Sequence, residues 1–218
     1  MQVILPILEP HLYRQPLAGR SLLEWALMSY PRDSTVLVLV PETEGEGPYW
    51  DTLVQLGWMV LAIALGPQVR DLVTAVAQVS HRLLPEAEVV IGSPTTLLAL
   101  HELSRAIAQF RSWEAVGGLV VDQQHRGASV TLDATTWTVL DVRQEEPLGP
   151  WTTQGPYWCA TGAAWGQAVQ RARSAGVVSL PLVFNHLPGL VRAVPVHTLH
   201  HLDTHAAYDL AANPGTQP

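Results

Sequence analysis

The sequence predicts an α/β protein, a three-layer α/β/α sandwich whose central sheet is mostly parallel and gains a mixed or antiparallel extension in the second half. Strand-like and helix-like segments alternate over the first half, as they do in chains built from βαβ units. Several short strand-like segments then follow one another closely, which favours antiparallel pairing. Hydrophobic residues make up 48% of the 218, enough to cover both faces of a sheet.

The first half begins with a buried strand and a capped helix. Val3–Ile7 is a continuous apolar run, typical of a strand that is covered on both faces. In Ser21–Tyr30 the apolar residues recur at helical spacing, and Ser21 and Glu24 predict a capping box. Pro31 ends this helix. Further strands are predicted at Thr35–Val40, Trp58–Leu65 and Glu88–Ile91, and further helices at Tyr49–Leu56 and Asp71–Leu84.

The second half is predicted to start with a helix and to continue in short strands. We expect one domain over residues 1–212 and a disordered polar tail over 213–218. The predicted helices are Thr96–Phe110, Ala163–Ser174 and a short final helix at Thr204–Ala211, and the predicted strands are Gly118–Val121, Ala128–Leu132, Thr136–Val142, Trp151–Ala160 and Leu190–Val196.

Composition excludes several classes of function. The formal net charge is −7, and all 12 cationic residues are arginine, so a Schiff-base lysine is impossible. An acidic chain without basic runs is a poor partner for nucleic acid or for an anionic membrane surface. The sequence shows neither an apolar run of about 18 residues nor a signal peptide, so we expect a cytoplasmic protein. Cys159 stands alone and is expected to be a buried small residue.

Five segments carry a family resemblance through their order along the chain. They are VILPI at Val3–Ile7, PLAGRSLLEWAL at Pro16–Leu27, the stretch at Trp137–Tyr157, NHLPGLVRAVPV at Asn185–Val196 and LDTHAAYDL at Leu202–Leu210. In this order they resemble segments of the sugar-phosphate nucleotidyltransferases and related GT-A-type sugar-nucleotide folds. The resemblance implies a nucleotide cleft at the carboxyl ends of the parallel strands.

The chain departs from that family where the family has its chemistry. The family's glycine-rich loop, G-x-G-x-R, corresponds to Leu8–Gln15, which contains Glu9 and no glycine. Glu146 stands where the family has a lysine, and the fourth strand ends in IGSP at Ile91–Pro94, without a carboxylate for Mg²⁺. The departures predict a non-catalytic relative that requires no cofactor, with Mg²⁺ needed only if activity survives.

Six residues are predicted to line the ligand-binding cleft. The resemblance implies that the arginines meet phosphate or carboxylate, and that the hydroxyls after the fourth strand bond a ring or a ribose. A later threonine and glycine would touch the sugar. Each also has a purely structural interpretation, such as a helix cap or a bulge. The six are Arg14, Arg20, Ser93, Thr95, Thr153 and Gly155.

Histidines near the C-terminus form the strongest competing signal. His197, His200, His201 and His205 fall within nine residues, together with Asp203. His201 and His205 are four residues apart and would share a helix face, so with Asp203 they form a candidate metal site. A polar strand end followed by a helix that Asp203 caps explains the same residues.

Three functions therefore stay open. The first is a nucleotidyltransferase-like binding or regulatory protein, whose partner is a sugar nucleotide, another protein or a second copy of the chain. The second is a divergent active enzyme, metal-assisted through Asp122 or Asp203. The third is an assembly factor that binds no small molecule. Trp151 and Trp158 would line a cleft and stack a base or sugar ring if the chain binds a nucleotide. They would instead form an apolar contact surface if the chain binds a protein partner or a second copy.

Overall fold

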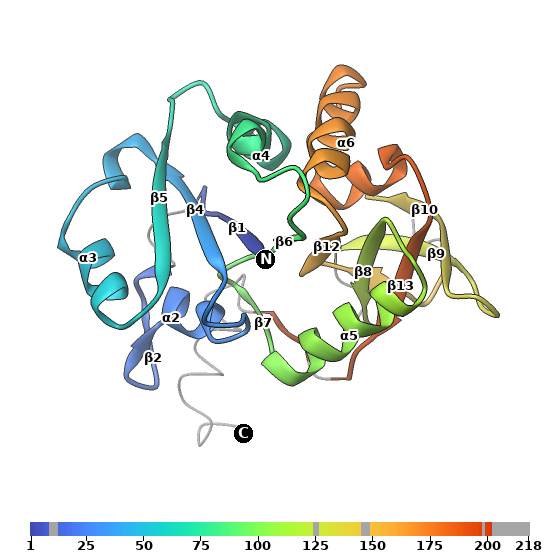
Figure 1. The fold of residues 1–218 in the computed structure, drawn as a ribbon, viewed down its shortest axis with the longest axis horizontal. Coiled ribbons are helices and arrows are strands. Elements are labelled where there is room, and N and C mark those ends of the chain that lie inside the picture. The colour runs from blue at the N-terminus through green and yellow to red at the C-terminus, as the bar shows by residue number, and fades with distance from the viewer. Residues whose placement is uncertain (9–12, 124–126, 145–148, 198, 202–218) are drawn as a thin grey trace, which may run out of the picture.

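A ten-stranded mixed sheet forms the centre of the molecule (Figure 1). The computed structural model describes residues 1–8, 13–123, 127–144, 149–197 and 199–201. Across the sheet the strands run in the order β11 (Thr152–Thr153), β9 (Ala128–Asp133), β10 (Thr138–Arg143), β13 (Val191–Pro195), β8 (Gly117–Val121), β12 (Tyr157–Cys159), β6 (Val89–Ile91), β1 (Gln2–Pro6), β4 (Thr35–Pro41) and β5 (Met59–Leu65).

The half of the sheet built from the first strands is parallel. β6, β1, β4 and β5 lie side by side, with Val3 opposite Val36 of β4 and Val90 of β6. All five residues of β1 are buried, which explains why the sequence reads as an unbroken apolar run rather than an alternating one.

The other half of the sheet is mixed, as the sequence predicts. β12 runs antiparallel between β6 and β8, whereas β13 pairs with β8 in parallel. β9, β10 and β11 add antiparallel strands at the far edge. The predicted single strand at Trp151–Ala160 is instead two short strands, β11 and β12. Between them lie a cis Gly155–Pro156 bond and Gly155 in a left-handed conformation.

Helices cover both faces of the sheet and produce the predicted three layers. Side chains of β1 alternate between two cores: Val3 and Leu5 pack on one face and Ile4 packs on the other. The helices of the first face are α2 (Leu22–Leu27), α3 (Pro48–Gln55) and α5 (Leu100–Ser112); those of the second are α4 (Leu72–Val79) and α6 (Gly162–Ser174), with the 3₁₀ turn η3 (Leu180–His186).

Two small sheets were not expected from the sequence. β2 (Pro16–Leu17) and β3 (Arg20–Ser21) form a hairpin just before α2. The predicted helix at Thr96–Phe110 is wrong in its first turn, because Thr96–Leu98 is a strand, β7, paired antiparallel with β14 (Leu199–His201). Leu98 and Leu199 are opposite one another and both are buried, so this long-range pairing overrides the local helical pattern.

The capping box of α2 is present as predicted. Ser21 Oγ accepts a hydrogen bond from the Glu24 amide, and Glu24 Oε2 accepts one from the Ser21 amide at 2.8 Å. The helix ends at Leu27, short of the predicted Tyr30, because bonds from Ser29 N to Ala26 O and from Tyr30 N to Leu27 O tighten its last turn.

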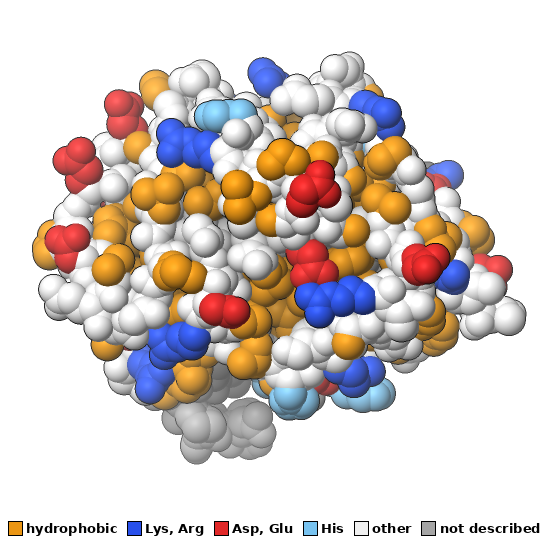
Figure 2. Space-filling view, viewed as in Figure 1, with side chains coloured by type: hydrophobic (Ala, Val, Ile, Leu, Met, Phe, Trp, Pro, Cys, Tyr) orange, Lys and Arg blue, Asp and Glu red, His pale blue; other side chains and the backbone are white. Residues whose placement is uncertain are grey.

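The C-terminal region differs from its prediction where it can be compared. His201 lies in β14 and not in a helix, because it pairs with Thr96 of β7. The predicted helix at Thr204–Ala211 and the tail at 213–218 lie outside the described residues. In the described part of the chain, no helix combines the length and the apolar character that crossing a membrane requires. Acidic and basic side chains are scattered over the face drawn in Figure 2.

Candidate functional site

The topology of the sheet singles out the carboxyl ends of β1 and β6. From β1 the chain moves outward to β4 and β5 through α2 and α3, which lie on one face. It then returns through α4 on the opposite face to β6, on the other side of β1. Where connections diverge to opposite faces in this way, open α/β sheets bind their ligands in the crevice outside the carboxyl ends of the strands.

A cavity of about 270 Å³ occupies this position. Pro6 at the end of β1 and Gly92 and Ser93 after β6 form one side of it. The loop before β12 and the segment around η3 form the other side, so residues far apart in sequence meet here. The remaining lining residues are Leu72, Thr95, Thr96, Gly127, Ala128, Gln144, Thr153, Gln154, Tyr157, Ser179, Leu180 and Pro181.

The described residues that line this cleft are polar but uncharged. They offer hydroxyls and side-chain amides, with neither a carboxylate nor a guanidinium among them. Such groups exchange neutral hydrogen bonds with hydroxyl-rich or amide-bearing ligands. The lining does not fit Mg²⁺, which prefers carboxylate oxygens together with substrate phosphates.

Ser93 and Thr95 are oriented by a tight local turn. Their hydroxyl oxygens lie 2.9 Å apart, and the Thr95 amide donates to Ser93 Oγ at 3.2 Å. The Thr96 amide donates to the Ser93 carbonyl, and β7 begins there. This turn presents two hydroxyls at the end of β6, the place where the resembling family has its metal carboxylate.

Packing excludes a side chain at Gly92. A Cβ added there would overlap the Tyr30 hydroxyl and come within 2.9 Å of Leu5 Cδ2. Tyr30 is 2% exposed, and burial raises the pKa of its hydroxyl. A carboxylate at position 92 is therefore incompatible with the present core, and the described residues supply no replacement at the strand end.

Thr153 and Tyr157 form the opposite wall. Thr153 is 1% exposed and donates from Oγ1 to the Val120 carbonyl at 2.7 Å, which fixes its rotamer. Burial raises the pKa of Tyr157, against a lowering from its hydrogen bond with Thr153, so the phenol stays neutral. Gly155 lies between them in sequence but does not line the cavity. Its backbone is left-handed (φ 92°), and a Cβ added to it would lie 3.3 Å from the Tyr157 ring.

The predicted arginines lie elsewhere. Arg14 forms an ion pair with Glu44 at 2.7 Å and donates to Tyr13 Oη at 2.7 Å, beside the end of β4. Arg20 belongs to β3, with its guanidinium carbon 5.6 Å from the centre of the Trp25 ring. Neither arginine lines the cleft. The structure thus brings together Ser93, Thr95 and Thr153 of the six predicted residues and leaves the two arginines apart.

The residues proposed for metal binding are not assembled in the described part of the chain. Asp122 is 5% exposed at the end of β8, where its Oδ1 accepts from Thr152 Oγ1 at 2.9 Å. Asp203 and His205 lie outside the described residues, as does the side chain of His201. Within the described ranges, no three His, Cys, Asp or Glu side chains gather closely enough to hold a metal ion.

Trp158 and Cys159 belong to the core rather than to a cleft. Trp158 is 2% exposed and stacks on Phe110 at 5.6 Å between ring centres. Trp151 packs edge-on against Trp137 at 5.4 Å. Burial raises the pKa of the Cys159 thiol to about 11, so it is a poor nucleophile at neutral pH.

Sequence reasoning missed Gln144 and Ser179, which meet across the cleft with Ser179 Oγ donating to Gln144 Oε1 at 2.6 Å. They are 35 residues apart, and no local pattern marks either one. It also missed a cavity of about 460 Å³ outside β4 and β5, where Glu42 and Arg70 lie. For Glu42 the available signal was its position just after the predicted strand Thr35–Val40.

Solved structures with the same architecture cover almost the whole chain. A nucleoside-diphosphate-sugar pyrophosphorylase from Vibrio cholerae superposes with a TM-score of 0.76 at 14% identity, over 98% of this chain and 100% of that one. The chain has the nucleotidyltransferase fold. An inositol-1-phosphate CTP transferase from T. maritima matches with a TM-score of 0.73 at 12% identity, over 100% of this chain and 98% of that one.

A third structure extends this range of activities within the nucleotidyltransferase fold. A 2-C-methyl-D-erythritol 4-phosphate cytidylyltransferase from Thermus thermophilus matches with a TM-score of 0.68 at 19% identity, over 99% of this chain and 98% of that one. No family model and no curated protein matches the sequence. At these identities the likeness establishes the fold, while function must be argued from the site.

Proposed function

We propose that this chain is a non-catalytic protein of the nucleotidyltransferase fold that binds a sugar nucleotide through its uncharged part, in a regulatory or assembly role. The observation that carries the proposal is that the described residues lining the cleft outside β1 and β6 are uncharged. The cleft lies at the switch point that ligands occupy in open α/β sheets. Its hydroxyls and amides suit the hydroxyls of a sugar or the edge of a base.

Nucleotidyl transfer requires charged groups that the described lining of the cleft does not contain. A metal ion must neutralise charge on the phosphates and align the attacking and leaving oxygens. Pro6, Gly92 and Ser93 stand at the ends of β1 and β6 instead of charged groups. Phosphates of a bound ligand would therefore point outward to solvent, and binding would not require Mg²⁺.

Isothermal calorimetry tests this proposal with UTP, dTTP, GTP, CTP and their sugar-nucleotide derivatives, with and without Mg²⁺. We expect at least one sugar nucleotide to bind with an affinity that Mg²⁺ leaves unchanged. Gln154→Ala in the cleft should weaken it about fivefold, the effect of one neutral hydrogen bond. Gln55→Ala, at an exposed position at the end of α3, is the matched control. Binding that depends on Mg²⁺ would contradict the proposal.

A divergent active enzyme is the second candidate. The cavity outside β4 and β5 favours it, because Glu42 and Arg70 supply there the charges that the neutral cleft lacks. This candidate predicts metal-dependent release of pyrophosphate that Glu42→Gln, in this cavity, abolishes. An assembly factor, the third candidate, predicts no thermal shift with any nucleotide and a stable complex with another protein.

A further inference from the structure

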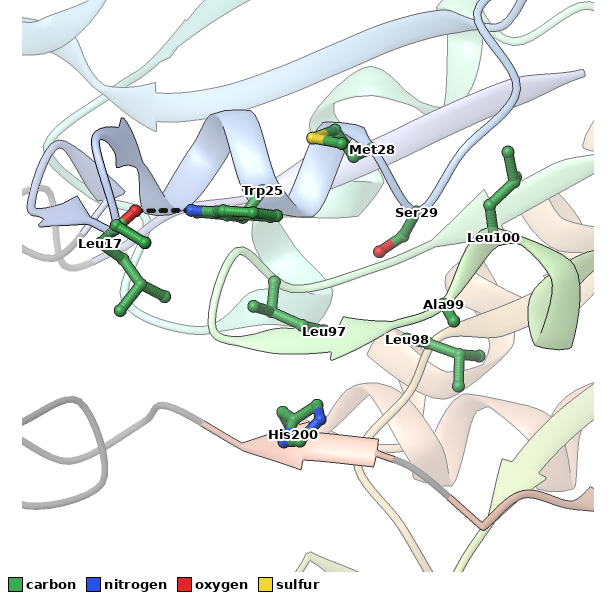
Figure 3. Close-up of a pocket in the computed structure, with 10 residues that line it drawn as sticks. Leu17, Trp25, Met28, Ser29, Leu97, Leu98, Ala99, Leu100 and His200 are labelled. Carbon is green, nitrogen blue, oxygen red and sulfur yellow. Dashed lines mark hydrogen bonds between the residues drawn. The ribbon is translucent and has the colours of Figure 1, made fainter. Parts of the chain in front are cut away.

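A second cavity lined by described residues lies apart from the neutral cleft. It encloses about 620 Å³, within the range of small-molecule sites. The β2–β3 hairpin and α2 form one wall, β7 and the start of α5 form the floor, and β14 closes the far side (Figure 3). Its lining residues are Leu17, Ala18, Trp25, Met28, Ser29, Leu97, Leu98, Ala99, Leu100 and His200.

Most of this groove is apolar. Trp25 Nε1 donates to the Leu17 carbonyl at 2.7 Å, so the polar edge of the indole is satisfied and its ring contributes apolar surface. Leu97 lies opposite Trp25, and Met28 and Leu100 are 40% and 41% exposed although they are large and hydrophobic. Water is displaced favourably from such a surface by an apolar ligand body.

Two polar side chains, Ser29 and His200, are among the residues that line the groove. Figure 3 shows the Ser29 hydroxyl pointing into the cavity from the end of α2 and the His200 ring on the opposite wall. Ser29 is 6% exposed. An apolar side chain from a protein partner would cover both groups without a hydrogen bond, which is costly. A small ligand that fills only part of the groove leaves water on these groups and avoids this cost.

The exposed guanidinium of Arg20 lies at the rim of the groove. Arg20 contacts two lining residues: its Nη1 lies 2.8 Å from Met28 Sδ and its guanidinium carbon 5.6 Å from the Trp25 ring centre. Among the described residues, none of the ion pairs includes Arg20. Four of its five side-chain N–H groups can therefore serve an anion, and guanidinium binds carboxylate in a fork geometry.

We propose that this groove binds a small amphipathic carboxylate, with an apolar body along Trp25 and Leu97 and its head on Arg20. The volume suits a medium-length acyl chain or a fused aromatic ring. The site is distinct from the neutral cleft, although β7 borders both: Thr96 lines the cleft and Leu97 lines the groove. Success or failure of the nucleotide proposal leaves this one unaffected.

Decanoate and decan-1-ol provide the test, since they share an apolar chain and differ in charge. Calorimetry, or displacement of the fluorescent aromatic anion anilinonaphthalene sulfonate, should show decanoate binding about tenfold more tightly than decan-1-ol. Arg20→Gln should remove that preference and leave decan-1-ol unchanged. Leu97→Gln should weaken both ligands. Thermal unfolding of each variant verifies that the fold is intact.

Arg32→Gln is the matched control. Arg32 is also an exposed guanidinium over a tryptophan, 3.7 Å from the Trp58 ring centre, but it lies outside the groove. Its loss changes the net charge equally and should leave decanoate binding unchanged. Equal weakening by Arg20→Gln and Arg32→Gln would overturn the proposal, as would equal binding of decanoate and decan-1-ol to the native chain.

Other occupants of the groove have their own signatures. A native dimer that Leu97→Gln converts to a monomer, measured by light scattering, would assign the groove to a second copy and overturn the proposal. Leu210→Asp places a charge in the chain's own C-terminal segment. If decanoate bound this variant and not the native chain, the groove would be assigned to that segment, and the proposal would be overturned. Absence of binding in all variants would also refute it.

Discussion

Replacement of Gly92 by alanine should destabilise the protein, because the new methyl group overlaps the Tyr30 hydroxyl. Tyr30 and Leu5 are 2% and 0% exposed, so neither side chain can move outward freely. Overpacking of a close-packed core costs about 1–3 kcal/mol. For a chain of 218 residues this lowers the unfolding temperature by roughly 2–12 °C.

A double-mutant cycle identifies the cause. Tyr30→Phe removes the overlapping hydroxyl, and the nearest remaining atoms are Leu5 Cδ2 at 2.9 Å and Tyr30 Cζ at 3.0 Å. Calorimetric or urea unfolding should give a favourable coupling of about 1 kcal/mol between the two substitutions. Gly149→Ala, with nothing within 4 Å, is the control and should change stability by less than about 0.5 kcal/mol. A Gly92→Ala protein as stable as the native chain, or a coupling of zero, would refute the packing argument for the missing carboxylate.

Three further predictions follow from other contacts. Burial raises the folded-state pKa of the Cys159 thiol from 9.0 to about 11, so the protonated thiol stabilises the folded state fully below pH 9 and progressively less as pH rises toward 11. The free energy of unfolding should therefore fall by about 1 kcal/mol by pH 10. In urea unfolding measured against pH, Cys159→Ala should remove this part of the pH dependence. Glu44→Gln breaks the ion pair with Arg14, whose side chain is 45% exposed, so it should lower the free energy of unfolding in urea by less than about 1 kcal/mol. Nucleotide affinity should stay unchanged. A tenfold loss of affinity would show that Arg14 belongs to the nucleotide site. Gly118→Ala places a methyl group against the Phe110 ring and should lower the free energy of unfolding by about 1–3 kcal/mol in the same assay. An unchanged stability would contradict close packing of Phe110 on β8.

The layers of the fold were predictable because buried parallel strands leave a strong signal. Thr35–Pro41 is an almost continuous run of Val and Leu, and in the structure it is buried on both faces between β1 and β5. The capping box at Ser21 was predictable because it depends on two residues three apart. β7 was not, since Thr96–Leu98 becomes a strand only through pairing with a segment about a hundred residues later.

The candidate cleft was predictable in part because it lies at the ends of strands that the sequence makes recognisable. Ser93 and Thr95 follow a recognisable strand, so their place at the sheet edge could be inferred. Arg14 was misplaced because nothing local shows that Glu44, 30 positions away, pairs with it. Gln144 and Ser179 are brought to the cleft only by the three-dimensional path of the second half, and the groove beside Trp25 likewise depends on β14.

Release of pyrophosphate measures the central claim most directly. The native chain would be incubated with each nucleoside triphosphate, a panel of sugar phosphates and Mg²⁺ or Mn²⁺, and pyrophosphate would be followed by a coupled phosphatase assay. A neutral cleft at β1 and β6 predicts no release above the protein-free background for any pair. Turnover at an ordinary enzymatic rate of about 1 s⁻¹ or more, abolished by chelation of the metal, would contradict it.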